Sequence, residues 1–425
     1  MKSYKKRILD DILREELSVM GAVVIEGAKW CGKTTTAEQA ASSVVYIDEE
    51  GKTEENLLLA RTAPARILDG THPRLIDEWQ LTPILWDAIR YRVDRSSSPG
   101  SYILTGSSVP PDSEEIRHSG AGRFSWLRMR PMSLWESGDS SGAVSLSALF
   151  AGDKPSCGES AVDSLEEIAF LICRGGWPYV SSLKTNAALN VAFAYVDAIA
   201  RKDISRVDDM DRDENRARRL FRSYARLQGT QSTAAVIKAD LAANEPKAFS
   251  EATICSYVNA LKRLFTIEDM PAWCPNLRCK TPVRTSETRY FADPSIATAS
   301  LGLGPEDLMD DLRTLGLMFE TMACRDLRVY AGALRGTVSH YKDANGLECD
   351  MVVHLRNGRY GLVEVKLGGK ELIEKGAATL EKLARLIDTK KMKSPSFKMV
   401  LTAVGGFAYQ REDGVIVCPI GCLRP

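Results

Sequence analysis

A glycine-rich segment near the N-terminus has the residue types and spacing of a phosphate-binding loop. Residues 27–34 read Gly-Ala-Lys-Trp-Cys-Gly-Lys-Thr, which fits the Walker A pattern GxxxxGK[ST] at every fixed position. An apolar run at 22–26 precedes the segment and a helix-like stretch follows it, which is the context that this loop needs. Glycines let the backbone turn sharply, so that successive N–H groups and the N-terminus of the next helix point at phosphate oxygens. We therefore expect Lys33 to reach the outer phosphates of ATP and Thr34 to ligate Mg²⁺. The candidate nucleotide-binding residues are Gly27, Ala28, Lys29, Trp30, Cys31, Gly32, Lys33, Thr34 and Thr35.

Two further apolar runs downstream end in side chains that suit nucleotide hydrolysis. The run 74–76 is followed by Asp77 and Glu78. An acid in this place can ligate or orient Mg²⁺, and its neighbour can polarise the attacking water. The run 102–105 leads to Ser107, which is placed to hold that water, although a Ser/Gly turn has the same composition. Arg123 follows a flexible stretch and is either an arginine finger, in the same chain or across a subunit interface, or a structural arginine.

Near the C-terminus, three charged residues fit a second metal-dependent chemistry. Asp350 opens one apolar run, and Glu364 and Lys366 end the next. Alternate residues of a strand share a face, so Glu364 and Lys366 lie together, and a hairpin closed at 356–359 brings Asp350 beside them. Two carboxylates and a lysine can hold Mg²⁺ and stabilise charge on a phosphate, with Asp350 and Glu364 as the metal ligands. Glu320, on a predicted helix upstream, is placed as a further acid, as in restriction-enzyme-like nucleases. An ordinary exposed edge strand is the alternative interpretation.

The charge near this constellation suits a polyanion. Residues 356–398 contain eleven Lys or Arg against five Asp or Glu. The whole chain, in contrast, balances 56 basic against 56 acidic residues, so nucleic acid would have to bind to a local patch.

The elements that must position these residues fall into three zones. Residues 1–136 alternate short apolar runs with helical stretches, which predicts an α/β domain with a parallel five-stranded sheet. Residues 137–284 begin with a Ser-, Gly- and Asp-rich linker up to about residue 160 and continue as a helical region. Residues 285–425 mix helices with strands and are predicted to form an α/β domain of the restriction-endonuclease type.

The helical region contains the parts of a winged helix. Between 231 and 293, a short helix, a longer helix and an extended stretch follow one another. Arginines from 212 to 226 are numerous, but acids accompany them. They either contact phosphates of DNA or, as we favour, serve protein contacts or the structure itself.

Composition excludes several classes of protein. The chain has 425 residues, of which 44% are hydrophobic and 26% charged, as in a folded globular protein of two to four domains. Its ten cysteines are scattered, which favours reduced thiols over a disulfide scaffold. The sequence shows neither a signal-peptide core nor the apolar stretch of a membrane span. We expect no membrane association and a cytoplasmic location.

With these motifs, nearly the whole chain resembles the predicted AAA+ superfamily ATPases of bacteria and archaea, whose C-terminal part is a domain of unknown function related to PD-(D/E)XK nucleases. The resemblance rests on segments 27–34, 75–80, 103–107, 122–123, 130–136, 175–178, 253–264, 289–293, 319–320 and 350–366. It implies ATP binding, ATP hydrolysis and the three-part architecture. One departure is Lys29-Trp30-Cys31, where relatives usually carry Arg, a polar residue and a small residue. The property that this departure would change is the affinity of the loop for a nucleotide.

We therefore expect an ATPase whose nucleotide cycle, run by Lys33, Thr34, Asp77 and Glu78, controls the helical module and the nuclease-like domain. The target would be DNA or another nucleic acid. The alternative is a nucleotide-dependent switch or scaffold whose nuclease-like domain is inactive and binds a protein or DNA. Either form can be an oligomer.

Overall fold

The computed structural model describes residues 4–96, 98–109, 116, 118–155, 158–208, 210–244, 249–274, 286–390 and 392–425. The chain divides into two compact units. Unit 1 consists of Met1–Pro131, Lys202–Arg212 and Asn259–Thr266, and unit 2 consists of Met132–Arg201, Asp213–Val258 and Ile267–Pro425. Two short segments of the predicted helical region thus belong to the same unit as the N-terminal domain. The predicted domain boundaries at 136 and 284 stay a prediction.

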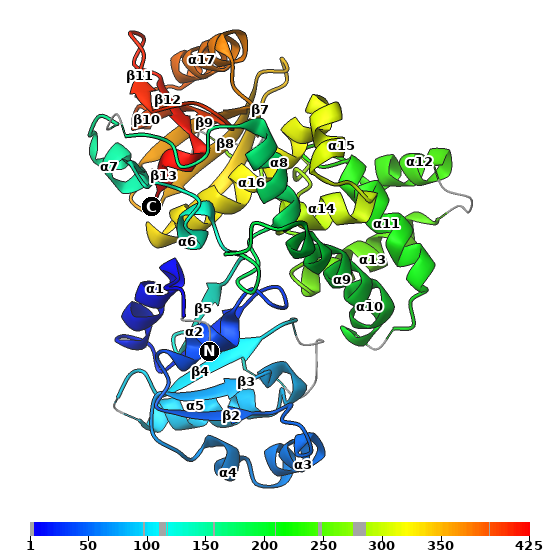
Figure 1. Cartoon of the computed structure of the whole chain (residues 1–425). Helices are drawn as coiled ribbons and strands as arrows, with labels where there is room; N and C mark the ends of the chain where they lie inside the picture. The colour runs from blue at the N-terminus through cyan, green and yellow to red at the C-terminus, as the bar shows by residue number, and fades with distance from the viewer. Residues whose placement is uncertain are drawn as a thin grey trace. The chain divides into compact units, whose positions relative to one another are not determined.

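A parallel sheet of five strands forms the centre of unit 1, in the order β2-β3-β4-β1-β5 (Figure 1). The strands are β1 (Ala22–Glu26), β2 (Ser43–Tyr46), β3 (Arg74–Asp77), β4 (Tyr102–Gly106) and β5 (Phe124–Arg128). The predicted five-stranded parallel sheet is confirmed. Because β4 lies between β1 and β3, its carboxyl end separates the phosphate loop from the acid pair.

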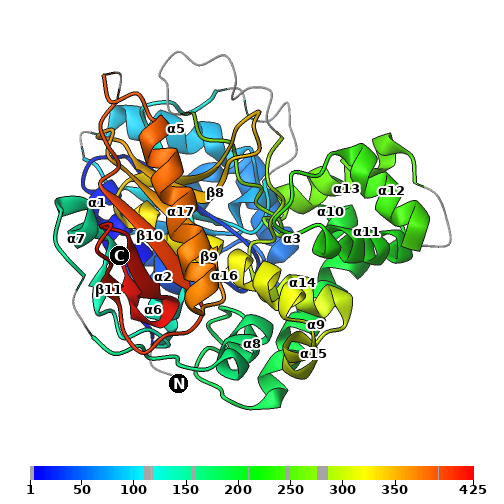
Figure 2. The same ribbon diagram turned by 90° about the horizontal axis from the view of Figure 1, so that it is seen from above.

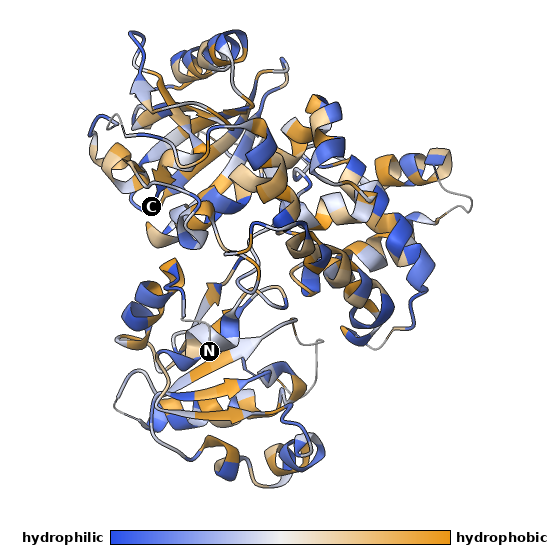
Figure 3. Ribbon diagram, viewed as in Figure 1, coloured by the Kyte–Doolittle hydropathy of each residue, from blue (hydrophilic) through white to orange (hydrophobic). Residues whose placement is uncertain are grey.

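Helices cover both faces of this sheet, since its strands are apolar on both sides (Figure 3). The helices of unit 1 are α1 (Ile8–Leu17), α2 (Lys33–Glu38), α3 (Thr53–Thr62), α4 (Pro64–Leu68), α5 (Leu85–Arg95) and α10 (Ile204–Arg206). On β1, Val24 packs in one core cluster with Ile89 of α5. Its neighbour Val23 packs on the other face with Leu13 of α1 and Ala37 of α2. The alternation along one strand thus fixes which helix lies on which face.

A mixed sheet of six strands, in the order β11-β12-β10-β9-β8-β7, forms the C-terminal part of unit 2. The strands are β7 (Gly336–Lys342), β8 (Glu348–Leu355), β9 (Tyr360–Lys366), β10 (Phe397–Thr402), β11 (Tyr409–Gln410) and β12 (Ile416–Pro419). Strand β8 is antiparallel to β7 and β9, as the predicted hairpin requires, whereas β10 is parallel to β9 and β12. Helix α17 (Lys370–Leu386) runs along β9 and β10 (Figure 2).

Helices dominate the rest of unit 2. They are α6 (Leu134–Ser137), α7 (Leu146–Ala151), α8 (Leu165–Arg174), α9 (Asn190–Ala198), α11 (Glu214–Arg226), α12 (Ala234–Asn244), α13 (Glu251–Arg263), α14 (Pro294–Leu301), α15 (Pro305–Asp310) and α16 (Leu312–Ala333). Helix α13 begins in unit 2 and ends in unit 1. A π-helical turn, Ile199–Asp203, leads from α9 into unit 1.

Two local predictions are wrong. The predicted linker at 136–160 contains the end of α6, strand β6 (Val144–Ser145) and helix α7, and β6 pairs with β13 (Leu423–Arg424). Some of the Ser and Gly residues in this stretch are helix caps: Ser145 accepts a hydrogen bond from the Ala148 N–H, Gly138 ends α6, and Gly152 ends α7 with a φ of +97°. The apolar spacing of residues 307–323 predicts a single helix that carries Glu320, but the structure has two helices there, because Asp311 stops α15 and caps the first turn of α16.

Candidate functional site

The phosphate loop connects β1 to α2, and both of its fixed glycines are required by the backbone. A Cβ on Gly27 would lie 2.0 Å from the carbonyl oxygen of Met129. Gly32, directly before α2, has a φ of +102°, which side chains disfavour. Lys33 is buried, and its Nζ donates a hydrogen bond to the carbonyl oxygen of Ala28 at 2.9 Å. The Lys33 side chain is therefore folded back over the loop, on which the phosphates are expected to bind.

The rest of the loop is held from outside. The guanidinium of Arg7 donates to the carbonyl oxygen of Cys31 at 2.7 Å, and the thiol of Cys31 is buried against the carbonyl oxygen of Met129. Lys29 forms an ion pair with Asp203, with 2.6 Å between Nζ and Oδ1. Trp30 takes a left-handed conformation with a φ of +64°, and its side chain is exposed.

Thr34 and Asp77 meet at the start of α2 and the end of β3. The Thr34 hydroxyl donates to Oδ1 of Asp77 at 2.8 Å, and the hydroxyl of Thr105 donates to the same oxygen. Burial raises the pKa of Asp77, and the two hydroxyls act in the opposite direction because they stabilise the carboxylate. The pair predicted to hold Mg²⁺ is thus in contact. Thr105 was not predicted, although the register places it directly beside Asp77.

Glu78 forms a second cluster with Ser107 and Gln80. The Ser107 hydroxyl donates to Oε2 of Glu78 at 2.8 Å, and the Gln80 amide donates to the same oxygen. Glu78 has a φ of +56°, a strained backbone for a residue with a side chain. Ser107 therefore lies beside the candidate base, and its role in holding the attacking water stays a prediction. Gln80 belongs to segment 75–80 but had no predicted role.

Arg123 lies at the amino-terminal end of the strands, opposite to the end that carries the phosphate loop. Its carbonyl oxygen accepts from the N–H of Ala22, the first residue of β1, whereas the phosphate loop follows the last residue of β1. Its guanidinium pairs with Asp94 of α5 at 2.7 Å. Arg123 pairs here with Asp94 and not with a residue of the phosphate loop, and its role as an arginine finger, in the same chain or across a subunit interface, stays a prediction.

The four charged residues predicted near the C-terminus come together in unit 2. Nζ of Lys366 lies 3.0 Å from Oδ2 of Asp350 and 2.7 Å from Oε2 of Glu364. The N–H of Val365 also donates to Asp350, at 2.8 Å. Glu320, on α16, is close enough for its charge to interact with all three. We call Glu320, Asp350, Glu364 and Lys366 the carboxylate cluster.

Burial sets the protonation of this cluster. It raises the pKa of Glu320 to about 8 and that of Glu364 to about 7, and the charge of Asp350 adds to both shifts. Burial alone would lower the pKa of Lys366, but its two carboxylate partners raise it. The hydroxyl of Tyr290 donates to Oε1 of Glu320. The ammonium of Lys366 thus occupies the position between the two predicted metal ligands.

Across the described ranges, no group of three or more His, Cys, Asp or Glu side chains is arranged to hold a metal ion. Asp350 and Glu364 provide two oxygen donors and share a lysine. As they stand, they do not form a complete metal site, and their role as metal ligands stays a prediction.

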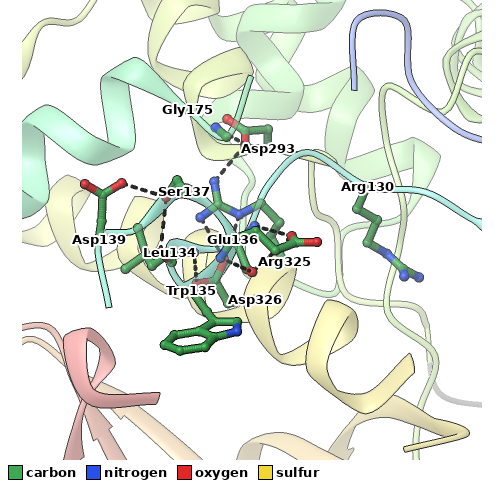
Figure 4. A network of polar contacts seen from close by, with 12 residues as sticks. Arg130, Leu134, Trp135, Glu136, Ser137, Asp139, Gly175, Asp293, Arg325 and Asp326 are labelled. Atoms are coloured by element: carbon green, nitrogen blue, oxygen red, sulfur yellow. Dashed lines mark hydrogen bonds and ion pairs between the residues drawn. The ribbon is translucent and has the colours of Figure 1, made fainter. Parts of the chain in front are cut away.

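Several of the motif segments meet in a buried network in unit 2 (Figure 4). Arg325 of α16 pairs with Asp293 at 2.9 Å and with Asp326 at 2.7 Å. Asp293 accepts from the N–H of Gly176 at 3.0 Å, and Asp326 accepts from the N–H of Leu134 at 2.9 Å. Segments 130–136, 175–178 and 289–293 therefore meet in one buried network that links them to α16.

The winged helix is described only in part. Helices α12 and α13 are present, and the bridges Ile267–Phe291 and Met270–Thr288 are antiparallel, as at the base of a hairpin. Residues 275–285, where the predicted wing would lie, are outside the described residues. The arginines Arg212, Arg218 and Arg226 form ion pairs with acids, which supports a structural role for them.

Comparisons with known families cover most of the chain. Residues 20–137 match the family described as "AAA domain". Residues 165–307 and 315–423 match two families described as domains of unknown function, DUF8612 and DUF4143. No curated protein matches the chain. The N-terminal part is therefore a P-loop domain of the AAA type.

Two solved structures are similar at low identity. One is the Walker-type ATPase PABY2304 of Pyrococcus abyssi, with 14% identity, a TM-score of 0.40, and coverage of 70% of this chain and 96% of that chain. The other is the Orc1 protein of Aeropyrum pernix in complex with DNA, with 11% identity, a TM-score of 0.24, and coverage of 71% and 94%.

None of the helices that the structure describes combines the length and the apolar character needed to cross a membrane.

Proposed function

We propose that unit 1 binds ATP with Mg²⁺ and hydrolyses it. The observation that carries this proposal is that three chain segments come together at the carboxyl ends of the strands. The phosphate loop, the Thr34–Asp77 contact at 2.8 Å and the Glu78–Ser107 contact at 2.8 Å lie at the carboxyl ends of β1, β3 and β4. These ends of parallel strands are where ligands bind in α/β sheets.

The residues present fit the nucleotide and its metal ion. Gly27 leaves no room for a side chain, Gly32 turns the backbone into α2, and Lys33 is already folded over the loop. Thr34 and Asp77 are the side chains that would hold Mg²⁺, which neutralises phosphate charge when it is bound.

The hydrolysis that these groups support is an in-line displacement. Glu78 accepts a proton from water, the water oxygen forms a bond to the terminal phosphorus, and the bond from that phosphorus to the bridging oxygen breaks, which gives ADP and phosphate. Ser107, hydrogen-bonded to Glu78, fixes the orientation of that carboxylate. Lys33 stabilises the charge on the phosphate oxygens.

Phosphate release by wild type and by the Lys33→Ala variant tests the proposal. The variant should lose turnover, whereas Lys52→Ala, which removes an exposed lysine paired with Glu49, should keep it. Turnover that is equal in wild type and Lys33→Ala would show that the site is assigned wrongly.

A second function is supported by the carboxylate cluster. We infer that residues 285–425 form a nuclease-like domain that acts on nucleic acid, because Lys366 joins Asp350 and Glu364 at 3.0 and 2.7 Å. The alternative is a domain that binds DNA or a protein without cutting, with the nucleotide cycle of unit 1 as its switch. Either form fits a monomer or an oligomer.

Incubation of plasmid and single-stranded DNA with Mg²⁺ or Mn²⁺ separates the two. Cleavage that Asp350→Ala abolishes supports a nuclease. An intact substrate in every nucleotide state supports the binding role.

A further inference from the structure

A lysine inside the phosphate loop is held by an acid from a distant part of the chain. Lys29 and Asp203 are 174 residues apart, and their charged atoms lie 2.6 Å from each other. The Asp203 side chain is 10% exposed, so little water screens it, whereas Lys29 is 42% exposed. The AAA match ends at residue 137, so Asp203 belongs to a segment outside it. This segment is nevertheless part of unit 1.

The segment that carries Asp203 is well fixed. Asp203 ends the π-helical turn and α10 follows it (Figure 1). Arg212 closes the segment: its guanidinium pairs with Asp208 at 2.5 Å and donates to the carbonyl oxygen of Ile204 at 2.7 Å. Its N–H donates to the hydroxyl of Ser205 at 3.0 Å. Asp203 is thus presented to the loop by a folded turn, and π-helical turns are frequent at functional sites.

The contact adds little to stability in itself, since ion pairs with a half-exposed partner contribute weakly. Its position gives it another consequence. Lys29 is one of the four residues between the two glycines of the loop, whose amides are expected to surround the phosphates. An ammonium group there can pair either with Asp203 or with a phosphate oxygen, and Asp203 itself repels a bound triphosphate.

We propose that Asp203 is a positioning residue of the nucleotide site, which sets affinity for ATP by competing with its terminal phosphate for Lys29. This inference rests on the proposed function. When ATP binds, the ammonium of Lys29 moves from Asp203 to the phosphate oxygens, and the 202–212 segment loses its ion pair with the loop. ADP carries one negative charge fewer and competes less well. The helical segment therefore responds to whether the site holds ATP or ADP.

Nucleotide titrations on the full chain test this inference. Dissociation constants for ATP and ADP are measured by calorimetry for wild type, Asp203→Asn, Lys29→Met and the double variant. Asp203→Asn should bind ATP about fivefold more tightly and ADP about twofold more tightly. Lys29→Met should weaken ATP binding, and in that background Asp203→Asn should change it by less than about twofold. Asp203→Glu, which keeps the negative charge, should have the same dissociation constants for ATP and ADP as wild type.

A matched control is Asp197→Asn, which removes an acid of α9 that pairs with Arg218 in unit 2 and should leave both constants unchanged. Circular dichroism shows that each variant is folded. Equal ATP affinity in wild type and Asp203→Asn, or weaker binding of both nucleotides in Asp203→Asn, would overturn the inference while the proposed function stands. A wild-type protein that binds no ATP would instead refute the proposed function.

Discussion

Replacing Thr105 by valine should weaken unit 1 through the charge on Asp77. The substitution keeps the shape of a buried side chain and removes one hydrogen bond to Oδ1 of Asp77. A hydrogen bond to a charged group contributes about 1.5–3 kcal/mol, and one to a neutral group about 0.5–1.5 kcal/mol. Thr82→Val is the matched control, since the buried Thr82 hydroxyl donates to a neutral group, the carbonyl oxygen of Trp79.

The sign of the pH dependence follows from the pKa of Asp77. Burial raises this pKa, and the Thr105 hydroxyl lowers it by stabilising the carboxylate, so the variant should raise it further. When the pKa of a group is higher in the folded than in the unfolded state, the free energy of unfolding of the protein falls as pH increases. The free energy of unfolding of Thr105→Val should therefore fall most near neutral pH and least where Asp77 is protonated.

Two assays follow the effect. Urea unfolding across a pH series gives the stability difference between Thr105→Val and Thr82→Val. The pH profile of ATP hydrolysis should show the acid limb of kcat/KM moved to higher pH in Thr105→Val only. If the two valine variants behave alike in both assays, the charge-assisted hydrogen bond does not exist in solution and the reasoning fails.

Three other perturbations have defined outcomes. Glu78→Gln should keep ATP binding and lower kcat by at least about 100-fold, because the amide cannot accept the proton from water. An unchanged rate constant for the hydrolysis step in single-turnover assays would exclude Glu78 as the base. Glu320→Gln should remove one part of the pH dependence of stability. Because the pKa of Glu320 is raised to about 8, wild type should lose stability relative to the variant as pH rises from 4.5 to about 8. A difference in the free energy of unfolding between the two proteins that stays constant over this range, measured in urea, would contradict the assignment. Arg325→Met should cost about 3–5 kcal/mol, because it leaves the buried carboxylates of Asp293 and Asp326 without their cation; a loss below about 1 kcal/mol in denaturant unfolding would argue against the network.

The sequence predicted the sheet of unit 1 and its phosphate loop because both depend on local patterns. Fixed spacing defines the loop, and apolar runs define the strands. Thr34 and Asp77 were each predicted as a ligand of Mg²⁺ from two separate motifs, and the structure brings them into contact. Thr105 was missed because its role depends on register: only the pairing of β3 with β4 places it beside Asp77.

Contacts between distant segments were out of reach. Asp203 lies in a helical stretch with no local pattern that indicates a partner, and its contact with Lys29 exists only in the folded unit. The position of Arg123 is of the same kind, since its glycine-rich neighbourhood gives no indication that it pairs with Asp94 and lies beside the first residue of β1. The caps Ser145 and Gly152 were interpreted as linker because caps and loops share their composition.

The most direct measurement of the central claim is a calorimetric titration of the full chain with ATP and Mg²⁺, beside the Lys33→Ala variant. The account predicts saturable heat with about one nucleotide per chain for wild type, and binding weaker by at least about tenfold in the variant, since the buried ammonium of Lys33 lies over the loop. Folded wild-type protein that gives no saturable heat, or a variant that binds ATP as tightly as wild type, would contradict it.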